Sequence, residues 1–396
     1  MKLDKPRLPV SYVDSSEKLA QVCKSLSSVE RIGLDAERAS GFKYSQSAYL
    51  IQIATSDHIY LIDPVPLAAA DPAWAGGLAK AMKPITWLLH AATQDLPCLA
   101  ELGIRPSKLI DTELAARLAG LERVGLGSIA LELADIELAK EHSAADWSLR
   151  PLSPEMLDYA ALDVDVMFDI WDELETRLAT DGKLDWALEE FAHLVNFTPK
   201  APLAEPWRGL PGLSKVKDLA KVKIAAALWL ARDEVARDRD VAPGRLIPDR
   251  SIMAAVEQPP KSKSDLASNK AFQGRASRSM LNEWWDAIQQ SSNLDIELSP
   301  KEKGNGIPSH RSWEKRFPLA HRRLEIIRPK LLEVASGLSV PIENLLTPDY
   351  LRRVCFEPAE DVGGQLRALG ARNWQIDLVL ETITTGLELA ATQPEA

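Results

Sequence analysis

The stretch RIGLDAERA, residues 31–39, places two carboxylates one residue apart inside an otherwise apolar run. Side chains alternate between the two faces of a β-strand, so Ile32 and Leu34 would share one face while Asp35 and Glu37 point together from the other. A lone D-x-E pattern is common and usually marks the polar face of a half-buried strand. The pair becomes a metal platform only if further acids meet it, because neighbouring carboxylates repel unless a cation lies between them.

Further β-rich runs follow this strand and predict a sheet. The runs AYLIQIAT (48–55) and HIYLIDP (58–64) are separated only by Ser-Asp, which predicts a hairpin and, with the first strand, a three-stranded antiparallel meander. Two short strands are expected later, in ITWLLHA (85–91) and KLIDT (108–112), with short helices after each. Alternation of this kind predicts an α/β domain, a sheet flanked by helices, in the first 200 residues.

Two later segments supply acids in an order that lets them meet the first pair. In HAATQDL, Asp95 lies where a strand turns into a helix; alone it would be a helix-start acid that complements the helix dipole. His90 is expected to be a hydrogen-bonded core histidine, with a substrate contact as the alternative. On the helix that Ser153 should cap, Tyr159 and Asp163 are four residues apart and therefore share one face.

The acids are more informative together than singly. Four carboxylates, from Asp35, Glu37, Asp95 and Asp163, could converge at one end of the predicted sheet. Such a cluster is tolerable only with cations, and hard divalent ions prefer oxygen ligands. The pattern therefore favours two-metal phosphoryl chemistry.

Three segments carry a resemblance to a known family. IGLDAE, HAATQDL and DWSLRPLSPEMLDYAALDV resemble the exonuclease motifs of the DEDD superfamily in its tyrosine-containing branch, and the last is similar to bacterial ribonuclease D. The resemblance spans about residues 10–195. Residues 205–290 resemble the HRDC nucleic-acid-binding domain, and residues 305–390 resemble a second, more diverged HRDC-like domain. The resemblance implies a ribonuclease H-like (DnaQ-like) α/β exonuclease domain with a mixed sheet over 1–200, followed by two all-α HRDC-like helical domains.

The resemblance also implies a role for each motif residue. Asp35 would bridge two divalent metal ions, Mg²⁺ or Mn²⁺. Glu37 and Asp163 would complete one metal site, and Asp95 would hold the second ion largely through water. Tyr159 would orient the attacking water rather than act as a strong base, since a free tyrosine has a pKa of about 10. In-line attack on the terminal phosphodiester would release a nucleoside 5′-monophosphate.

The chain departs from the family pattern beside the acid pair. The threonine often found between the two acids is Ala36 here, and it faces the opposite side of the strand. After the glutamate the family often has a bulky apolar residue near the terminal bases, whereas this chain has Arg38. A guanidinium also stacks on bases, so Arg38 is expected to contact substrate.

Charge is distributed unevenly along the chain, whose net charge is −10. Residues 1–200 carry 19 Lys and Arg against 31 Asp and Glu, residues 201–330 carry 24 against 16, and residues 331–396 carry 4 against 10. A basic middle behind an acidic front is expected of a polyanion-binding module attached to a metal-binding module. A solvated helical surface would explain any single Lys or Arg equally well.

The helical part of the chain contains two breaks and one repeated sequence motif. Proline and glycine mark a linker near 199–212, and a second break covers 291–310. VAPGRLIPDRSI (241–252) and SVPIENLLTPDYL (339–351) share Leu-x-Pro-Asp. The repeated motif predicts either a duplicated helical module or two unrelated helices that are capped in the same way.

Several classes of protein are excluded or disfavoured. The three cysteines, Cys23, Cys98 and Cys355, are far apart and suggest neither a disulfide framework nor a zinc cluster, which fits a cytoplasmic protein. The start of the chain lacks a signal-peptide core, and the longest uncharged apolar run, 224–231, is too short to span a bilayer. The chain has no G-x4-G-K-[ST] phosphate loop, so a helicase motor is excluded.

The function favoured by these features is 3′-to-5′ exoribonuclease activity. The expected partner is structured RNA, such as tRNA precursors, and the family resemblance implies a monomer. A DNA exonuclease of the proofreading or Werner-like type is the alternative, because the carboxylate set does not distinguish the sugar. A non-catalytic nucleic-acid-binding protein on the same fold is a third hypothesis.

Overall fold

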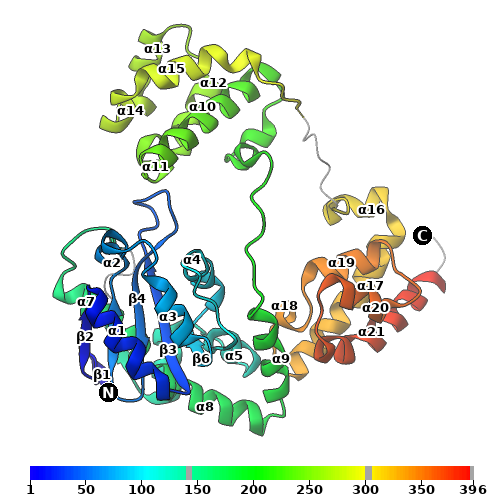
Figure 1. Cartoon of the computed structure of the whole chain (residues 1–396). Coiled ribbons are helices and arrows are strands. Elements are labelled where there is room, and N and C mark those ends of the chain that lie inside the picture. Colours follow the sequence, from blue (N-terminus) through cyan, green and yellow to red (C-terminus); the bar gives the residue numbers. More distant parts are fainter. Residues whose placement is uncertain (140–144, 299–305, 393–396) are drawn as a thin grey trace.

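The structure is a computed structural model that describes residues 1–139, 145–298 and 306–392. Figure 1 shows three groups of elements along the chain: a sheet with its helices, a first helical group around α10, and a second around α17. The predicted fold class, a mixed-sheet α/β domain followed by two all-α domains, is confirmed. The predicted break at 291–310 lies partly outside the described residues.

A six-stranded mixed sheet forms the centre of the first group, in the order β2-β5-β4-β3-β6-β7. The predicted meander is confirmed, because β3 pairs antiparallel with β4 and β4 antiparallel with β5, while the other neighbours run parallel. A separate parallel pair joins β1 to β8. The strands are β1 Lys2–Leu3, β2 Val10–Val13, β3 Arg31–Arg38, β4 Ala48–Ala54, β5 Ile59–Ile62, β6 Thr86–Leu89, β7 Lys108–Asp111 and β8 Glu137–Leu138.

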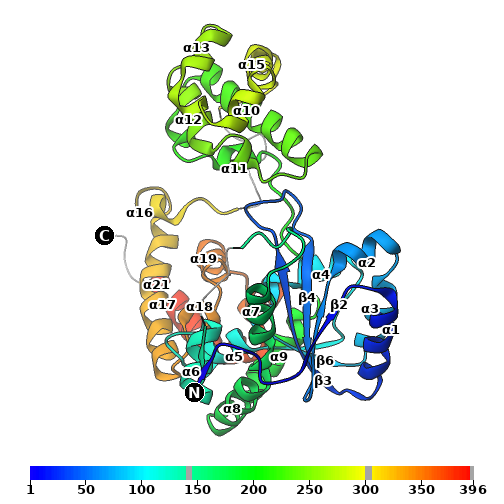
Figure 2. The ribbon, with the colours of Figure 1, turned by 90° about the vertical axis from the view of Figure 1, so that its left-hand side faces the viewer.

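Helices cover both faces of this sheet, as the turned view shows, with α1 to α3 on one side and α7 and α8 on the other (Figure 2). The predicted cap of α7 is present: Met156 N donates to Ser153 Oγ at 3.3 Å, and Pro154 occupies the first helical position. The helices are α1 Ser16–Ser25, α2 Pro64–Ala70, α3 Ala75–Met82, α4 Leu96–Glu101, α5 Thr112–Leu118, α6 Leu126–Ala134, α7 Pro154–Asp165, α8 Met167–Thr180 and α9 Leu184–Leu194.

Strand β3 lies inside the sheet, and both of its faces are covered. Ile32 and Leu34 are fully buried in the main core, while α7 crosses the opposite face. Gly33 permits this crossing, because a Cβ atom there would lie 3.0 Å from the backbone oxygen of Val164 and 3.3 Å from Met167 Cβ. The absence of a side chain at Gly33 thus lets the end of α7 approach β3. The close contact is at Val164, the residue after Asp163.

The first helical group has its own core, which contains the fully buried side chains of Phe272 and Trp284. Trp207 and Leu210 are also buried in it, so the predicted linker near 199–212 is too long: its last residues belong to the helical core. Trp207 lies in a short 3₁₀ turn, Pro206–Gly209, and Leu210 directly follows this turn. The helices of the group are α10 Leu219–Asp238, α11 Pro243–Leu246, α12 Asp249–Glu257, α13 Lys263–Ser268, α14 Arg275–Ser279 and α15 Leu281–Gln290.

The second helical group repeats the start of the first. Helices of 20, 4 and 9 residues follow one another in both, as α10, α11 and α12 and again as α17, α18 and α19. This repeated order of helices supports a duplicated helical module rather than two unrelated helices that are capped in the same way. The helices are α16 Trp313–Arg316, α17 Pro318–Gly337, α18 Ile342–Leu345, α19 Pro348–Phe356, α20 Val362–Leu369 and α21 Asn373–Thr392. None of the described helices is long and apolar enough to cross a membrane.

The second helical group packs against α9 of the α/β domain. Glu190 is 4% exposed, and its carboxylate accepts hydrogen bonds from Arg372 Nε at 2.9 Å and from Trp374 Nε1 at 3.0 Å. The Trp374 ring stacks on Trp186, with centroids 5.1 Å apart. One hydrophobic core runs through both parts. A chain cut near residue 200 would therefore lose the cover of this core and leave the Glu190 charge unpaired.

Candidate active site

The predicted acids converge at one end of the sheet, from three elements. Oxygen atoms of Asp35 and Glu37 on β3 and of Asp163 on α7 lie within 4.8 Å of one another. Asp95, at the start of α4, lies close enough to Asp35 that, besides burial, the charge of Asp35 raises its pKa. Together with Tyr159 they line a cleft of about 450 Å³. The structure thus brings together all five residues that the sequence singled out for chemistry.

The strand geometry around the acid pair turns Arg38 into the same cleft. The pairing of β3 with β4 shifts register between Glu37 and Arg38, and such a bulge bends the strand and re-aims the next side chain. Arg38 lines the cleft, and its charge opposes the rise in the pKa of Asp35, Glu37 and Asp95. Arg38 is therefore close enough to the acids to act on a bound substrate.

Gln52 is a neighbour of the acids that the sequence analysis missed. It lies directly opposite Asp35 in the β3–β4 ladder and is fully buried. Its Nε2 donates to Glu37 Oε1 at 3.5 Å, whereas its Oε1 has no hydrogen-bond partner within the described residues. The predicted hairpin fixes only the register of β4 with β5, so the sequence did not show which β4 residue lies opposite Asp35.

The position of Asp95 depends on a turn held by another buried acid. Asp111, at the end of β7, accepts hydrogen bonds from Ala91 N at 3.1 Å and from Ala92 N at 2.9 Å. Ala91 has a left-handed backbone, with φ of 58°, at the point where the chain leaves β6. Asp95 is the residue before α4, but its side chain makes no capping hydrogen bond there. Its carboxyl group instead meets Asp35.

His90 lies at the rim of the cleft and is hydrogen bonded within the domain. Its Nδ1 is 2.9 Å from Thr112 Oγ1, as expected of a hydrogen-bonded core histidine. Burial lowers the pKa of His90 to about 4, so its imidazole is neutral at neutral pH. His90 also lines the cleft, together with Gln94 and Glu113, two residues the sequence analysis did not select.

Tyr159 lies one helical turn from Asp163, and the two side chains share a hydrogen bond. Burial, followed by the charges of Asp163 and Glu37, raises the pKa of the Tyr159 hydroxyl well above its ordinary value. The hydroxyl therefore keeps its proton at neutral pH and acts as a hydrogen-bonding group. The ring packs beside Trp147, with centroids 6.3 Å apart.

Arg150 fixes the segment that leads into α7. Its guanidinium donates to the buried Asp63 carboxylate, from Nε and Nη2, at 2.6 Å each. It also donates to the carbonyl oxygens of Tyr49, at 2.7 Å, and Trp147, at 2.8 Å. Arg150 thereby ties the start of α7 to strands β4 and β5, which aligns Tyr159 with the acids on β3.

The electrostatics of the cleft indicate a cation site. Burial raises the pKa of Asp35, Asp95 and Asp163, and burial with the neighbouring acids raises the pKa of Glu37 to about 10. Carboxylates can ionise together in so small and buried a space only if positive charge lies among them. An all-oxygen donor set is what hard divalent cations prefer, so these residues fit a divalent metal.

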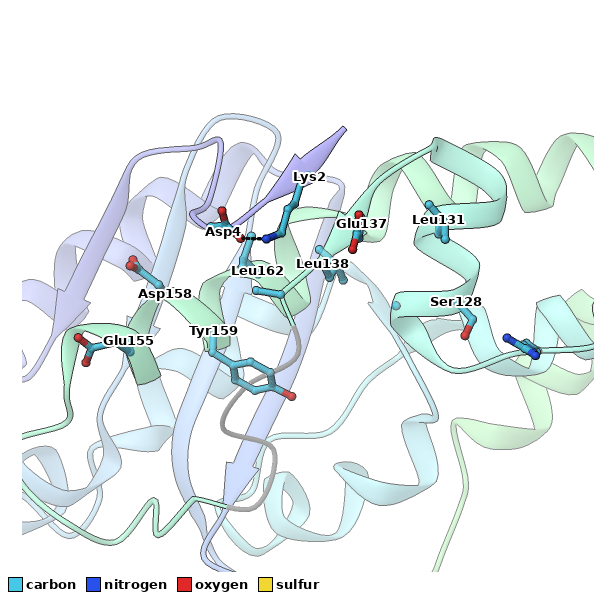
Figure 3. A pocket seen from close by; sticks show the side chains of 13 residues that line it. Lys2, Asp4, Ser128, Leu131, Glu137, Leu138, Glu155, Asp158, Tyr159 and Leu162 are labelled. Carbon is cyan, nitrogen blue, oxygen red and sulfur yellow. Dashed lines mark ion pairs between the residues drawn. The ribbon is translucent and has the colours of Figure 1, made fainter.

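Tyr159 also lines a second cavity, of about 690 Å³ (Figure 3). It is lined from β1, β8, α6 and α7, and the Lys2–Asp4 ion pair spans part of it, with nitrogen and oxygen 3.4 Å apart. Within the described residues, its acids do not form a cluster of the kind made by Asp35, Glu37 and Asp163. The smaller cleft is therefore the candidate active site.

Comparisons with known proteins agree with this geometry. A family model described as "3'-5' exonuclease" matches residues 10–179, an HRDC domain model matches 222–288, and a "3' to 5' exonuclease C-terminal domain" model matches 306–387. The Ribonuclease D of Granulibacter bethesdensis is 27% identical over 95% of this chain and 97% of its own length. The Ribonuclease D of Xanthomonas oryzae pv. oryzae is 33% identical over 65% of this chain and 71% of its own length.

Solved structures show the same fold. A crystal structure of a protein from Bifidobacterium adolescentis matches with a TM-score of 0.89 and 34% identity, covering 98% of this chain and 99% of that one. Escherichia coli RNase D, titled an exoribonuclease involved in structured RNA processing, matches in fold with a TM-score of 0.67 and 21% identity, covering 96% and 99%. The chain belongs to the ribonuclease D family and is a 3′-5′ exoribonuclease.

Proposed function

We propose that this exoribonuclease trims the 3′ ends of structured RNA, such as tRNA precursors, by hydrolysis that depends on two divalent ions, Mg²⁺ or Mn²⁺. The observation that carries the proposal is the convergence of Asp35, Glu37 and Asp163, with the carboxyl group of Asp95 beside that of Asp35. The names of the relatives support RNA over DNA as the substrate. A monomer is proposed on the same resemblance.

The four acids have distinct positions relative to a metal pair. Asp35 lies within 4.8 Å of Glu37 and Asp163, and its carboxyl group neighbours that of Asp95, so Asp35 would contact both ions. Glu37 and Asp163 would hold one ion with it, and Asp95 would hold the other largely through water. Bound divalent ions would lower the pKa of the attacking water and stabilise the leaving 3′ oxygen.

The remaining residues of the cleft orient the substrate and the water. Tyr159 keeps its proton and donates toward Asp163, which leaves its oxygen to accept a hydrogen bond from the attacking water. Arg38 presents a guanidinium to the terminal nucleotide, where it can stack on a base or pair with a phosphate. The Nδ1 atom of His90 is engaged by Thr112, so any substrate contact would use Nε2.

The basic charge that would hold the rest of the RNA is shared by both helical groups. Residues 206–293 carry 15 Lys and Arg against 10 Asp and Glu, and residues 306–330 carry 7 against 2. The basic middle of the sequence therefore does not coincide with one domain. We propose that both surfaces bind phosphates, with the first helical group as the principal contact for structured RNA.

The metal-ligand assignment predicts loss of turnover without loss of binding. Asp35→Asn or Asp163→Asn should lower turnover with Mg²⁺ or Mn²⁺ by more than about 100-fold. Mutation of a residue that only hydrogen bonds to a metal ligand typically lowers activity or metal affinity by about 10- to 100-fold, and loss of a ligand itself should cost more. Asp158→Asn, the same change on α7 outside the acid cluster, is the matched control. The measurement is the single-turnover rate at which RNA labelled at its 5′ end is shortened from its 3′ end. Turnover at the control level in either variant would refute the assignment.

The orienting role of Tyr159 predicts a separate effect. Tyr159→Phe removes only the hydroxyl, so turnover should fall about 10-fold or more while the affinities for RNA and metal stay near those of the unmodified protein. Tyr60→Phe, on β5, serves as the control for loss of a tyrosine hydroxyl. Steady-state kcat and KM, with metal titrations, separate these effects. An unchanged kcat would leave Tyr159 with a packing role only.

The raised pKa values predict how metal binding depends on pH. The metal-free native state binds more protons than the unfolded chain, so its stability falls as pH rises above about 4, the carboxyl pKa of the unfolded chain. A divalent cation needs the ionised carboxylates and relieves this loss. The rise in melting temperature on adding Mg²⁺ or Mn²⁺ should therefore be larger at about pH 8 than at about pH 5.5. Equal rises at both pH values, or an equal rise in Asp35→Asn, would contradict a metal site at these residues.

Binding of RNA by the first helical group predicts a change in salt dependence. Arg275 and Arg278 are exposed on α14, which contacts α11. Their double substitution by alanine should weaken binding of a tRNA-sized RNA and reduce the slope of log affinity against log salt by about 1 to 2. Lys24→Ala, which removes an exposed cation from the end of α1, is the control. Dissociation constants at several salt concentrations test this, and equal slopes would assign the basic charge to solubility alone.

A further inference from the structure

The loop that connects β3 to β4, residues 39–47, is bound to the first helical group. Both ribbon views show it extending from the sheet toward α11 (Figures 1 and 2). Its contacts involve side chains, backbone groups and aromatic rings, and they fall on the end of α10, on α11 and on the residues between them. The loop therefore joins the strand that carries the catalytic acids to the proposed RNA-binding helices.

Tyr44 is the part of the loop that enters the helical group. Its ring packs against the core of that group, which includes Ala236 and Leu246. Its hydroxyl donates to Asp233 Oδ1 at 3.0 Å and accepts from Arg237 Nη2 at 3.4 Å. A partly buried aromatic ring with a hydrogen-bonded tip is a common form of anchor.

Around this anchor, two charged residues of the helical group bind the loop backbone. Arg245 Nε donates to the carbonyl oxygen of Gly41 at 2.7 Å, and the guanidinium lies 4.0 Å from the centroid of the Phe42 ring. Asp240 accepts from Ser45 N at 2.9 Å and pairs with Lys43 at 3.4 Å. These contacts hold both sides of the loop.

The same loop begins inside the catalytic cleft. Ser40 lines the cleft, and Arg38 and Glu37 precede it on β3. The carbonyl oxygen of Ala39 accepts from Phe42 N at 3.0 Å and from Lys43 N at 2.9 Å, which makes the turn compact. Only a few ordered residues therefore separate the catalytic acids from the contacts with α10 and α11.

We propose that this loop fixes the position of the first helical group over the cleft, and that Tyr44, Asp240 and Arg245 are positioning residues for structured RNA. The inference rests on the proposed function, in which that group holds the body of an RNA whose 3′ end lies among the acids. Held rigidly, the two sites act on one RNA at a high effective concentration. If the junction loosens, this advantage is lost for long substrates and is irrelevant to short strands that occupy only the cleft.

Asp240 offers a test that separates positioning from direct RNA contact. Its backbone is left-handed, with φ of 46°, so Asp240→Gly removes the carboxylate without straining the backbone. Removing a negative charge near basic residues would, by electrostatics alone, strengthen RNA binding. Loosening of the junction would instead weaken RNA binding. The two explanations therefore predict opposite changes in RNA affinity.

The control is Asp238→Ala, which removes the same charge from the exposed last residue of α10. For Asp240→Gly we expect KM for a tRNA-sized RNA to rise about 5- to 10-fold, with kcat and KM for a short single strand unchanged. Tyr44→Phe, which removes no charge, should shift KM in the same direction. Asp238→Ala should leave KM equal or slightly lower.

A structural measurement on the protein without RNA completes the test. The distance distribution between spectroscopic labels on α1 and α15 should broaden in Asp240→Gly and stay narrow in Asp238→Ala. An Asp240→Gly protein that matches Asp238→Ala in both KM and distance distribution would overturn the positioning role. A broadened distribution with unchanged KM for structured RNA would show that the junction is fixed by the loop but that the helical group does not hold the substrate, which is a failure of the proposed function instead.

Discussion

Mutual repulsion among buried carboxylates is the constraint on which the catalytic domain depends. Asp35, Glu37 and Asp163 lie within 4.8 Å of one another, and burial makes their ionisation costly. The surrounding structure holds them there nevertheless: Gly33 admits α7 against β3, and the buried Asp111 holds the turn before Asp95. Without a cation these carboxyl groups keep their protons, and their joint ionisation requires positive charge among them, so cation binding at this site is linked to pH by the same electrostatics.

The two helical groups are attached to this domain in physically different ways. The second shares a continuous hydrophobic core with it, reinforced by the buried Glu190 carboxylate and its bonds to Arg372 and Trp374. The first has a separate core and meets the domain through the loop after β3, by way of Tyr44 and its neighbours. A buried core resists separation by itself, whereas the position of the first group depends on the hydrogen bonds, the ion pair and the aromatic contacts of this loop.

Arg38 illustrates how a departure from a family pattern can be assessed from local geometry. It follows the acid pair on β3, and the bulge between Glu37 and Arg38 turns it into the cleft. Its positive charge partly offsets the repulsion among the acids. In the proposed function Arg38 would also contact the substrate, whereas an apolar residue in this position could not offset the charge of the acids.

The sequence by itself determined the α/β class, the antiparallel meander and the residues of the acid cluster, because strand alternation and helical spacing are local properties of the chain. The short repeated motif Leu-x-Pro-Asp also indicated the duplicated helical module. Tertiary structure alone decided that Gln52 faces Asp35, that Asp111 supports Asp95, and that Trp207 belongs to a core rather than a linker. It likewise decided which helical group shares a core with the catalytic domain. These facts rest on contacts between residues far apart in sequence, and such contacts depend on packing that no local pattern records.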